Sequence, residues 1–151
     1  GRHRAKTLLD YGSGKGRQYT EHRSHLEWGN ILPTCYDPAY PPYANKPTHQ
    51  FDGVICTDVA EHWPEREVDN FLKDVIGYAR KFVVFCIFTG LARKSLPDGR
   101  NAHLTVRPPE WWNERIAKAI SAAEVHTETT EGIFTIKHDK REIVVIYRYK
   151  E

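Results

Sequence analysis

Residues that could hold a ligand or move a proton follow three apolar segments of the sequence. The first segment, Thr7–Tyr11, contains Asp10 near its end and is followed by Gly12, Gly14 and Gly16. Glycine lets the backbone adopt positive φ and lets a ligand approach it closely. A helix start behind these glycines would offer free N–H groups and the positive end of a dipole. The segment therefore predicts a ligand-binding loop.

Two ligand classes could use this loop. A dinucleotide site requires G-x-G-x-x-G, and its third glycine would fall at position 17, which is Arg17. The dinucleotide pattern therefore fails. A glycine loop alone is also compatible with a tight turn that binds nothing, so the choice depends on the acids that follow the next segments.

Acidic residues also follow the second and third apolar segments. Asp37 closes the segment Ile31–Tyr36, and a carboxylate in that place can accept both hydroxyls of a ribose. The third segment, Phe51–Thr57, runs into Asp58-Val59-Ala60-Glu61-His62. Because ligands bind at the carboxyl ends of parallel strands, we expect these residues to meet near the glycine loop.

Two histidines are candidates for acid–base chemistry. His62 follows the third apolar segment, and His103 lies in the loop after the fourth, Lys81–Thr89. Imidazole titrates near neutral pH and therefore suits a general base. Glu61 is expected to orient His62 or to contact the substrate. Structural roles for the histidines and a solvated carboxylate for Glu61 stay open.

The elements that must position these residues alternate between strand and helix. Helices are predicted over Arg17–Trp28, from Pro64 and from Pro108, and two further strands over Val125–Ile136 and Glu142–Tyr149. This order predicts an α/β fold: a three-layer sheet, mostly parallel, with an antiparallel C-terminal hairpin and helices on both faces. Residues 1–151 are expected to form a single domain.

The succession of motifs resembles the class I S-adenosylmethionine (SAM)-dependent methyltransferases. Asp10-x-Gly-x-Gly-x-Gly16 matches motif I, Asp37 matches motif II, and Thr57–His62 matches the D-V-x-E-H stretch. The segment LPDGRNAHLTVRPPEWW is similar to segments of small uncharacterised methyltransferase-like proteins of phages and marine bacteria. The resemblance covers roughly residues 6–149 and implies a Rossmann-like fold, SAM as cofactor and S-adenosylhomocysteine as product.

The resemblance also implies roles for individual residues. Asp10 would hold the ammonium of SAM, often through water, and Pro38 would lie against the adenine. The full implied binding set is Asp10, Tyr11, Gly12, Ser13, Gly14, Gly16, Asp37, Pro38, Thr57, Asp58 and Val59. The implied catalytic set is His62, His103 and Glu61.

The sequence departs from the family pattern between Asp37 and Phe51. Only a short, proline-rich stretch stands there, where family members have a further strand and helix. We therefore expect one edge strand to be missing, together with the usual N-terminal lid helix. The predicted function is methyl transfer to an O or N nucleophile of a small molecule or an RNA. The alternative is a non-catalytic SAM-binding module, and completion of the site by an identical or different subunit stays open.

Composition and charge indicate which partners and which cellular compartment to expect. The formal net charge is only +2, although Arg2, His3, Arg4 and Lys6 form a basic start that suits a polyanion. No segment reaches the roughly 18 apolar residues that span a bilayer, so no membrane partner is expected. Three cysteines without a CxxC pair predict free thiols in the cytoplasm. His22 and His25 lack a clear third ligand, and no metal site is predicted.

Overall fold

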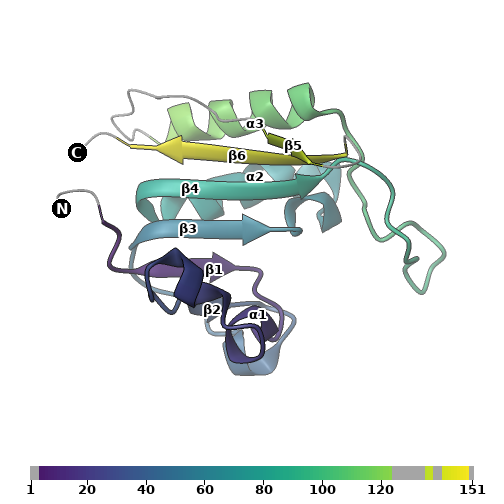
Figure 1. Cartoon of the computed structure of the whole chain (residues 1–151). Coiled ribbons are helices and arrows are strands. Elements are labelled where there is room, and N and C mark those ends of the chain that lie inside the picture. Colours follow the sequence, from purple (N-terminus) through teal and green to yellow (C-terminus); the bar gives the residue numbers. More distant parts are fainter. Residues whose placement is uncertain (1–3, 124–134, 138–140, 150–151) are drawn as a thin grey trace.

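A twisted sheet runs through the molecule (Figure 1). The computed structural model describes residues 4–123, 135–137 and 141–149, and within them six strands follow the order β2-β1-β3-β4-β6-β5. The first four are parallel, and β6 and β5 are antiparallel additions: β1 (Leu8–Tyr11), β2 (Thr34–Tyr36), β3 (Phe51–Thr57), β4 (Ala79–Phe88), β5 (Thr135–Lys137) and β6 (Glu142–Arg148). The predicted mostly parallel sheet with an antiparallel C-terminal hairpin is confirmed.

Two long helices cover one face of this sheet. Helix α2 (Glu65–Gly77) and helix α3 (Pro109–Ala122) lie side by side behind β4 and β6 (Figure 1). The apolar residues at helical spacing are the buried ones: Val68, Phe71, Leu72, Val75 and Ile76 of α2, and Trp112, Ile116, Ala119 and Ile120 of α3. Each large side chain contributes about 1.5–3 kcal/mol by burial. This face therefore anchors the fold.

The opposite face carries a much thinner layer, and here the predicted helix Arg17–Trp28 is wrong. The chain forms one α-helical turn, α1 (Arg17–Thr20), and then a 3-10 helix, η1 (Ser24–Trp28). The two are separated because Arg23 adopts a left-handed conformation with φ of +51°. Tyr19 is the buried residue of α1, and η1 buries none, so the segment lacks the apolar stripe that would hold a longer helix against the sheet.

The remaining boundaries differ in smaller ways from expectation. The proline-rich stretch contains a 3-10 turn, η2 (Pro41–Tyr43), and another, η3 (Ala60–His62), follows β3. Within the described residues β2 forms the edge of the sheet, as expected if the family's further edge strand is missing. Residues 4–7 form no helix. Most of the predicted strand Val125–Ile136 and the turn 138–140 lie outside the described residues. No helix in the described part of the chain is long and apolar enough to cross a membrane.

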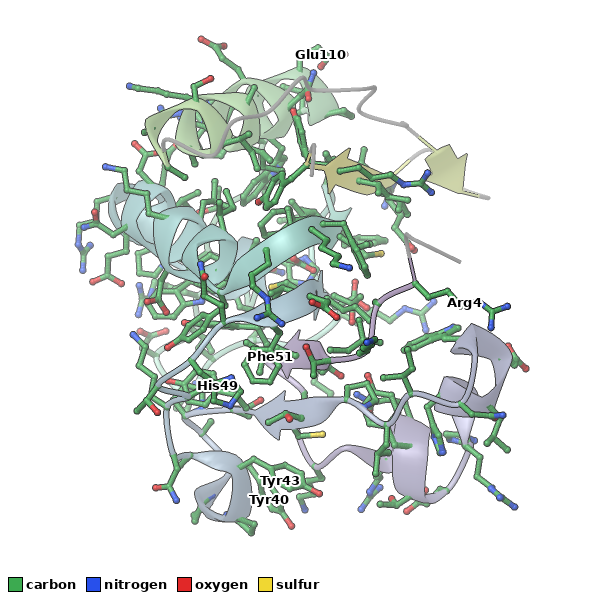
Figure 2. The ribbon with its side chains drawn as sticks, turned by 90° about the vertical axis from the view of Figure 1, so that its left-hand side faces the viewer. Arg4, Tyr40, Tyr43, His49, Phe51 and Glu110 are labelled. Carbon is green, nitrogen blue, oxygen red and sulfur yellow. The ribbon has the colours of Figure 1, made fainter. Side chains whose placement is uncertain are left out.

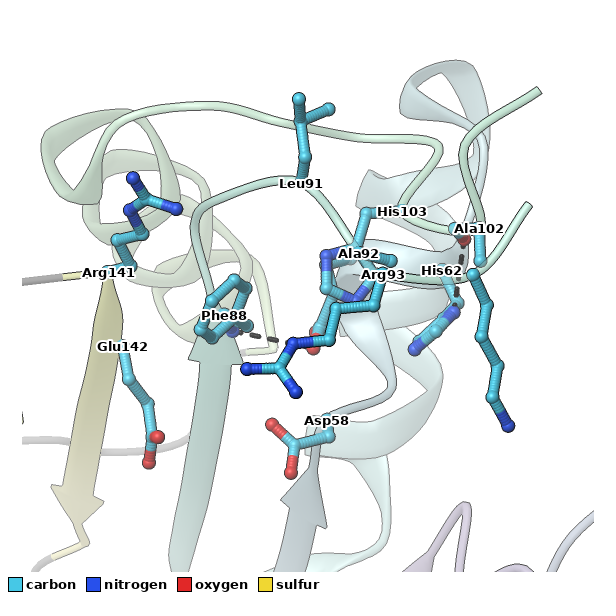
Figure 3. Close-up of a pocket in the computed structure, with 12 residues that line it drawn as sticks. Asp58, His62, Phe88, Leu91, Ala92, Arg93, Ala102, His103, Arg141 and Glu142 are labelled. Atoms are coloured by element: carbon cyan, nitrogen blue, oxygen red, sulfur yellow. Dashed lines mark hydrogen bonds between the residues drawn. The ribbon is translucent and has the colours of Figure 1, made fainter. Parts of the chain in front are cut away.

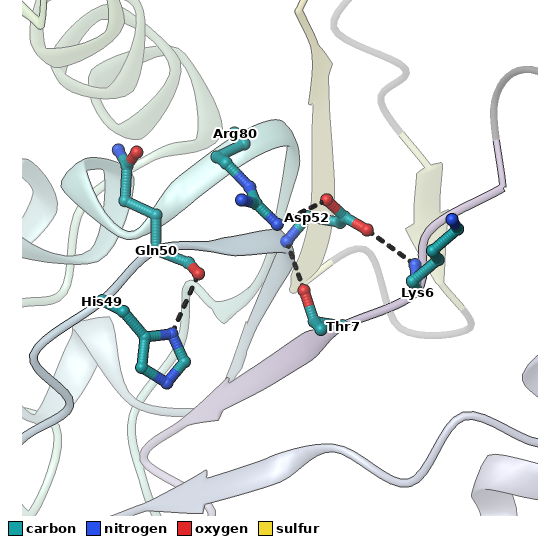
Figure 4. A network of polar contacts seen from close by, with 6 residues as sticks. All are labelled: Lys6, Thr7, His49, Gln50, Asp52 and Arg80. Atoms are coloured by element: carbon teal, nitrogen blue, oxygen red, sulfur yellow. Dashed lines mark hydrogen bonds and ion pairs between the residues drawn. The ribbon is translucent and has the colours of Figure 1, made fainter.

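Figure 2 shows the two ends of this arrangement, with Tyr40 and Tyr43 together beside β2 and Glu110 of α3 far from them. At the amino edge of the sheet, Asp52 forms a closed polar network (Figure 4). Its carboxylate accepts hydrogen bonds from the Lys6 backbone N–H at 2.7 Å and from Arg80 at 2.9 Å. The Asp52 N–H donates to Thr7 Oγ1 at 2.9 Å. These contacts tie the start of β3 to the start of β1 and β4.

Candidate functional site

The glycine loop follows β1 and is fixed to the end of β2. Gly12, Gly14 and Gly16 have φ of +84°, +56° and +67°, so each uses the conformation that favours glycine. The N–H groups of Gly12 and Ser13 donate to the Tyr36 carbonyl oxygen at 2.7 and 3.2 Å. Around Gly14 a Cβ atom would meet nothing within 4 Å. The loop is thus held at its start and open at its middle.

Asp37 closes the other side of the same loop. Its Oδ2 accepts a hydrogen bond from the Gly14 N–H at 2.7 Å, and its Oδ1 accepts one from the Ala39 N–H at 2.8 Å. The structure therefore brings together two predicted cofactor residues that are distant in the sequence. Each carboxylate oxygen still has a second lone pair that can accept a hydroxyl. Pro38, the predicted neighbour of the adenine, is exposed beside Asp37.

Close packing joins the glycine loop to the loop after β3. A Cβ atom on Gly12 would lie 2.4 Å from Cγ2 of Val59, so this glycine is required by a neighbour as well as by its φ. At Gly16 a Cβ atom would meet the Tyr43 ring at 3.2 Å and Cys35 Sγ at 3.3 Å. Tyr43 is thus a loop neighbour that the sequence analysis did not assign.

Asp10 and Tyr11 turn their side chains into the protein. Asp10 is 2% exposed, and its Oδ2 accepts hydrogen bonds from the Tyr19 hydroxyl at 2.6 Å and the Gln18 amide at 2.8 Å. Burial raises the pKa of Asp10, while the Tyr19 hydrogen bond opposes that rise. The Tyr11 hydroxyl donates to Asp74 of α2. Both groups hold β1 to its neighbours, and contact of Asp10 with a cofactor stays a prediction.

A cavity of about 550 Å³ opens at the carboxyl ends of the parallel strands β3 and β4, beside the amino end of the antiparallel strand β6 (Figure 3). It is lined by Asp58 and by all three predicted catalytic residues, Glu61, His62 and His103. The glycine loop and Asp37 are not among its lining residues. Thr57 instead faces a second cavity of about 1080 Å³ on the thinly covered face of the sheet, beside Trp28 and Phe82. The cofactor residues predicted after β3 are therefore divided between two cavities.

The two histidines meet although they lie on different loops. Their ring centroids are 4.8 Å apart in an edge-to-face arrangement. His62 Nδ1 lies 3.1 Å from the Ala102 carbonyl oxygen, and His103 Nδ1 lies 2.8 Å from the Gly90 carbonyl oxygen. Because a carbonyl only accepts, the neutral rings carry their protons on Nδ1 and keep a lone pair on Nε2. Burial and the neighbouring His103 lower the pKa of His62, which favours this neutral form.

Glu61 forms the floor of the cluster. It is fully buried, and its Oε1 accepts a long hydrogen bond of 3.4 Å from the Phe88 N–H. Its Oε2 has no hydrogen-bond partner among the described residues. Burial raises the pKa of Glu61 to about 7. A buried acid with an unpartnered oxygen is unusual, because such groups are normally hydrogen-bonded.

The loop after β4 is shaped by Asn101, which the sequence analysis quoted without assigning a role. Its side chain accepts from the Ala92 N–H and donates to the Ala92 carbonyl, both at 2.9 Å. The same Oδ1 accepts from the His103 N–H at 3.0 Å. Further along, Thr105 donates to the backbone oxygens of Glu61 and Trp63. These bonds fix His103 against His62.

Comparisons with known proteins give no sequence relative. No protein-family model matches the chain, and no curated protein sequence matches it. Solved structures do match. The 1,6-didemethyltoxoflavin-N1-methyltransferase of Burkholderia thailandensis superimposes with a TM-score of 0.61 and 19% identity, over 97% of this chain and 72% of that one. The 16S rRNA (adenine(1408)-N(1))-methyltransferase of Catenulisporales acidiphilia gives 0.61 and 16%, over 97% and 85%.

Human N-acetylserotonin methyltransferase, solved in complex with SAM, gives a TM-score of 0.65 and 13% identity over 97% of this chain. The chain spans 48% of that enzyme and 51% of an O-methyltransferase family protein from Burkholderia thailandensis, so about half of their length. Because these sequence identities are low, the likeness concerns the fold alone. The sheet order, the glycine loop after β1 and these superpositions together show that the chain has the Rossmann-like fold of the class I SAM-dependent methyltransferases.

Proposed function

We propose that this chain is an enzyme that binds SAM on the glycine loop and transfers its methyl group to an O or N nucleophile in the cavity beside Asp58. The observation that carries the proposal is the convergence of Glu61, His62 and His103 on one cavity, next to a glycine loop that Val59 contacts directly. Ligands of open α/β sheets bind at this carboxyl edge. The solved structures named for the human and toxoflavin enzymes hold SAM and S-adenosylhomocysteine, respectively.

The glycine loop fits the cofactor. Gly14 has open space where a side chain would stand, so a ligand can approach its backbone. The Asp37 carboxylate beside it would accept the ribose hydroxyls with its remaining lone pairs. Pro38 is exposed and would face the adenine. The remaining motif residues, including Ser13 and Thr57, are proposed contacts of lesser weight.

Bound SAM supplies an electrophilic methyl carbon: an acceptor lone pair forms the new bond, and the electrons of the broken C–S bond stay on sulfur, leaving S-adenosylhomocysteine. The chain contributes positioning and a proton acceptor. Nε2 of His62 or His103 carries a lone pair and takes the proton that an acceptor hydroxyl loses. The lowered pKa of His62 favours the neutral ring that can act as this base.

The acceptor is a small molecule or an RNA. Arg93, Lys94 and Arg141 line the same cavity as Asp58 and Glu142, so acids and bases are mixed there. An RNA acceptor would be bound mainly through its phosphates, and its affinity would fall steeply with added salt. A small acceptor would be nearly indifferent to salt. Measuring the turnover of candidate acceptors at two salt concentrations separates these classes.

A second candidate function is a SAM-binding module that completes a partner protein. The thin layer over one face of the sheet favours it, because α1 has a single turn and the 1080 Å³ cavity beside Trp28 exposes the strands. Such a module would keep its function after His62→Ala and His103→Ala. An enzyme that uses either histidine as a base would lose turnover and still bind SAM.

The first test is calorimetric titration with SAM, S-adenosylhomocysteine and NAD. We expect binding of the first two, no binding of NAD, and loss of binding in Asp37→Ala. Glu114→Ala, an exposed acid on α3, is the matched control and should bind SAM as the unchanged chain does. Binding of NAD, or equal SAM binding by Asp37→Ala, would contradict the proposal.

A further inference from the structure

We propose that Glu61, His62 and His103 form a binding site for a divalent cation of the zinc, cobalt, iron or manganese type. Each residue offers one ligand atom, and these atoms lie within 4.8 Å of one another. Glu61 and His62 belong to η3, and His103 comes from the loop after β4. The sequence alone predicts no metal site, because these residues suit acid–base chemistry and His22 and His25 have no clear third ligand.

The orientation of both imidazoles suits metal binding. Each Nδ1 is paired with a backbone carbonyl oxygen, at 3.1 Å for His62 and 2.8 Å for His103. Metal-binding histidines in proteins characteristically donate their other ring N–H in this way, which fixes the ring and directs the free nitrogen to the metal. Asn101 supports the arrangement, because its side chain accepts from the His103 N–H at 3.0 Å.

The buried carboxylate is the independent observation. Glu61 is 0% exposed and its Oε2 has no hydrogen-bond partner in the described part of the chain. Leaving a buried polar atom without a partner costs about 1–3 kcal/mol, and more for a charged group. A cation would neutralise this carboxylate and occupy the unpartnered oxygen. A bound cation would therefore explain why Glu61 is buried with an unpartnered oxygen, and the two imidazoles are suitable ligands for the same cation.

The donor set determines the kind of cation. Two imidazole nitrogens and one carboxylate suit zinc, cobalt, iron and manganese, whereas magnesium and calcium prefer oxygen ligands alone. Bonds of about 2.0–2.2 Å place neighbouring ligands roughly 3–3.5 Å apart, so binding requires the three groups to close by about 1 Å. His62 is exposed, and the loop of His103 is partly exposed, so both can move this far.

Charges of both signs surround the cluster. Asp58 and Glu142 line the cavity as acids, and Arg93, Lys94 and Arg141 line it as cations. In Figure 3 the Arg93 side chain points toward Asp58 and overlaps His103 in the view, while His62 lies apart from them. A cation at the three ligands would therefore have both acidic and basic side chains nearby.

Three protein ligands leave coordination positions open toward the cavity. An acceptor hydroxyl bound there would lose its proton more easily, because a bound cation acts as a Lewis acid. That use deepens the proposed function and rests on it, and it would replace the histidine base, since the Nε2 lone pairs would be occupied. Binding of the cation itself does not depend on methyl transfer.

The test is a titration of the full, EDTA-treated and desalted chain with Co²⁺ and with Zn²⁺, without SAM. We expect one Co²⁺ per chain with the visible absorption of imidazole-bound cobalt, and one Zn²⁺ by calorimetry. His62→Ala, His103→Ala and Glu61→Gln should each raise the dissociation constant at least tenfold. The control is the double variant His22→Ala/His25→Ala, which removes two histidines that are neighbours in sequence and lie outside the cavity, and it should bind as the unchanged chain does.

Two results would overturn the site: no stoichiometric binding to the unchanged chain, or binding that persists in His62→Ala and His103→Ala but disappears in the His22/His25 variant. Circular dichroism of Glu61→Gln checks that this buried position still folds, and the two exposed-loop histidine variants carry the test in any case. A parallel SAM titration separates the two proposals. Cobalt binding without SAM binding would contradict only the proposed function. SAM binding without cobalt binding would contradict only the metal site.

Discussion

Asp52 near the start of β3 and Glu61 in η3, the 3-10 turn that follows β3, are both buried acids, with exposures of 5% and 0%. At the amino edge of the sheet, Asp52 accepts hydrogen bonds from Lys6 and Arg80, and the Lys6 N–H is the main cause of a pKa below its ordinary value (Figure 4). At the carboxyl edge, Glu61 keeps an unpartnered oxygen, and burial raises its pKa to about 7. The acid at the start of β3 is thus fully hydrogen-bonded, whereas the acid in the turn after β3 keeps an unpartnered oxygen.

The comparison shows at which edge of the sheet the fold tolerates a buried carboxylate oxygen without a hydrogen bond. A closed network such as that of Asp52 holds strands together and leaves no group for a ligand. Glu61, His62 and His103 line one cavity, and a possible ligand atom of each lies within 4.8 Å of the others. Parallel sheets bind ligands at their carboxyl edge. We therefore expect variants at the two edges to differ in the sign of their effect on stability.

The largest expected effect concerns the packing that holds the carboxyl-edge loops in place. In Gly12→Ala the new Cβ atom would lie 2.4 Å from Cγ2 of Val59, at a φ of +84°. The left-handed conformation costs about 1–2 kcal/mol and the overlap about 1–3 kcal/mol, so the free energy of unfolding should fall by about 4 kcal/mol. Urea unfolding measures this change.

Gly14→Ala is the matched control for the glycine loop. Its φ is +56°, but its Cβ atom would enter open space, so only the conformational cost of about 1–2 kcal/mol applies. A double-mutant cycle with Val59→Ala should give a coupling energy of at least about 1 kcal/mol at Gly12. Equal losses in Gly12→Ala and Gly14→Ala would show that Val59 does not hold the loop.

The next effect concerns the acid of the carboxyl edge. The pKa of Glu61 is about 7 in the folded chain against an ordinary 4.5, so folding favours its neutral form. The contribution of Glu61 to stability should therefore be fully present below pH 4.5 and be lost as pH rises through 7, by about 3 kcal/mol in total. Glu61→Gln lacks this titration. Its stability relative to the unchanged chain should thus be about 3 kcal/mol greater at pH 8 than at pH 5.

Urea unfolding at several pH values, with EDTA present throughout, measures this difference. EDTA is needed because a bound cation would compensate the carboxylate. Glu114→Gln, at an exposed position of α3, is the control and should show no such change with pH. If the stability of Glu61→Gln follows that of the unchanged chain at every pH, Glu61 is not held in an unfavourable environment.

The fold was predictable to the extent that apolar patterns alone position an element. The apolar residues of α2 recur at helical spacing and are buried, and residues 82–88 of β4 are a continuous apolar run. The helix predicted over Arg17–Trp28 was wrong because this segment lacks an apolar stripe that would pack against the sheet. Propensity is a weak guide when tertiary packing is absent, and the chain turns at Arg23 instead.

The candidate site was predictable as a set of residue types but not as a geometry. Strand ends on one edge brought Glu61 and His62 to His103, since parallel strands share that edge. No pattern in the sequence shows that Asp10 would be enclosed by Tyr19 and Gln18, or that Asp37 would accept from Gly14. Those contacts depend on side-chain directions and close packing between loops. The role of Gly12 toward Val59 was hidden for the same reason.

The smallest expected effect concerns the amino edge and tests the sign of the comparison. Asp52→Asn would keep the backbone contact with Thr7 but weaken the charged hydrogen bonds from Lys6 and Arg80, so stability at pH 7 should fall by about 1 kcal/mol. Because the folded pKa lies below the ordinary 3.8, this contribution is present above pH 3.8 and is lost as pH falls through the folded value. The loss relative to the unchanged chain should therefore be constant from pH 8 to pH 5 and shrink in more acidic buffer. Between pH 5 and pH 8 the stability of Glu61→Gln relative to the unchanged chain should therefore rise, whereas that of Asp52→Asn should stay constant. A matching pH dependence of the two variants would mean that the two edges do not differ in how they hold their acids.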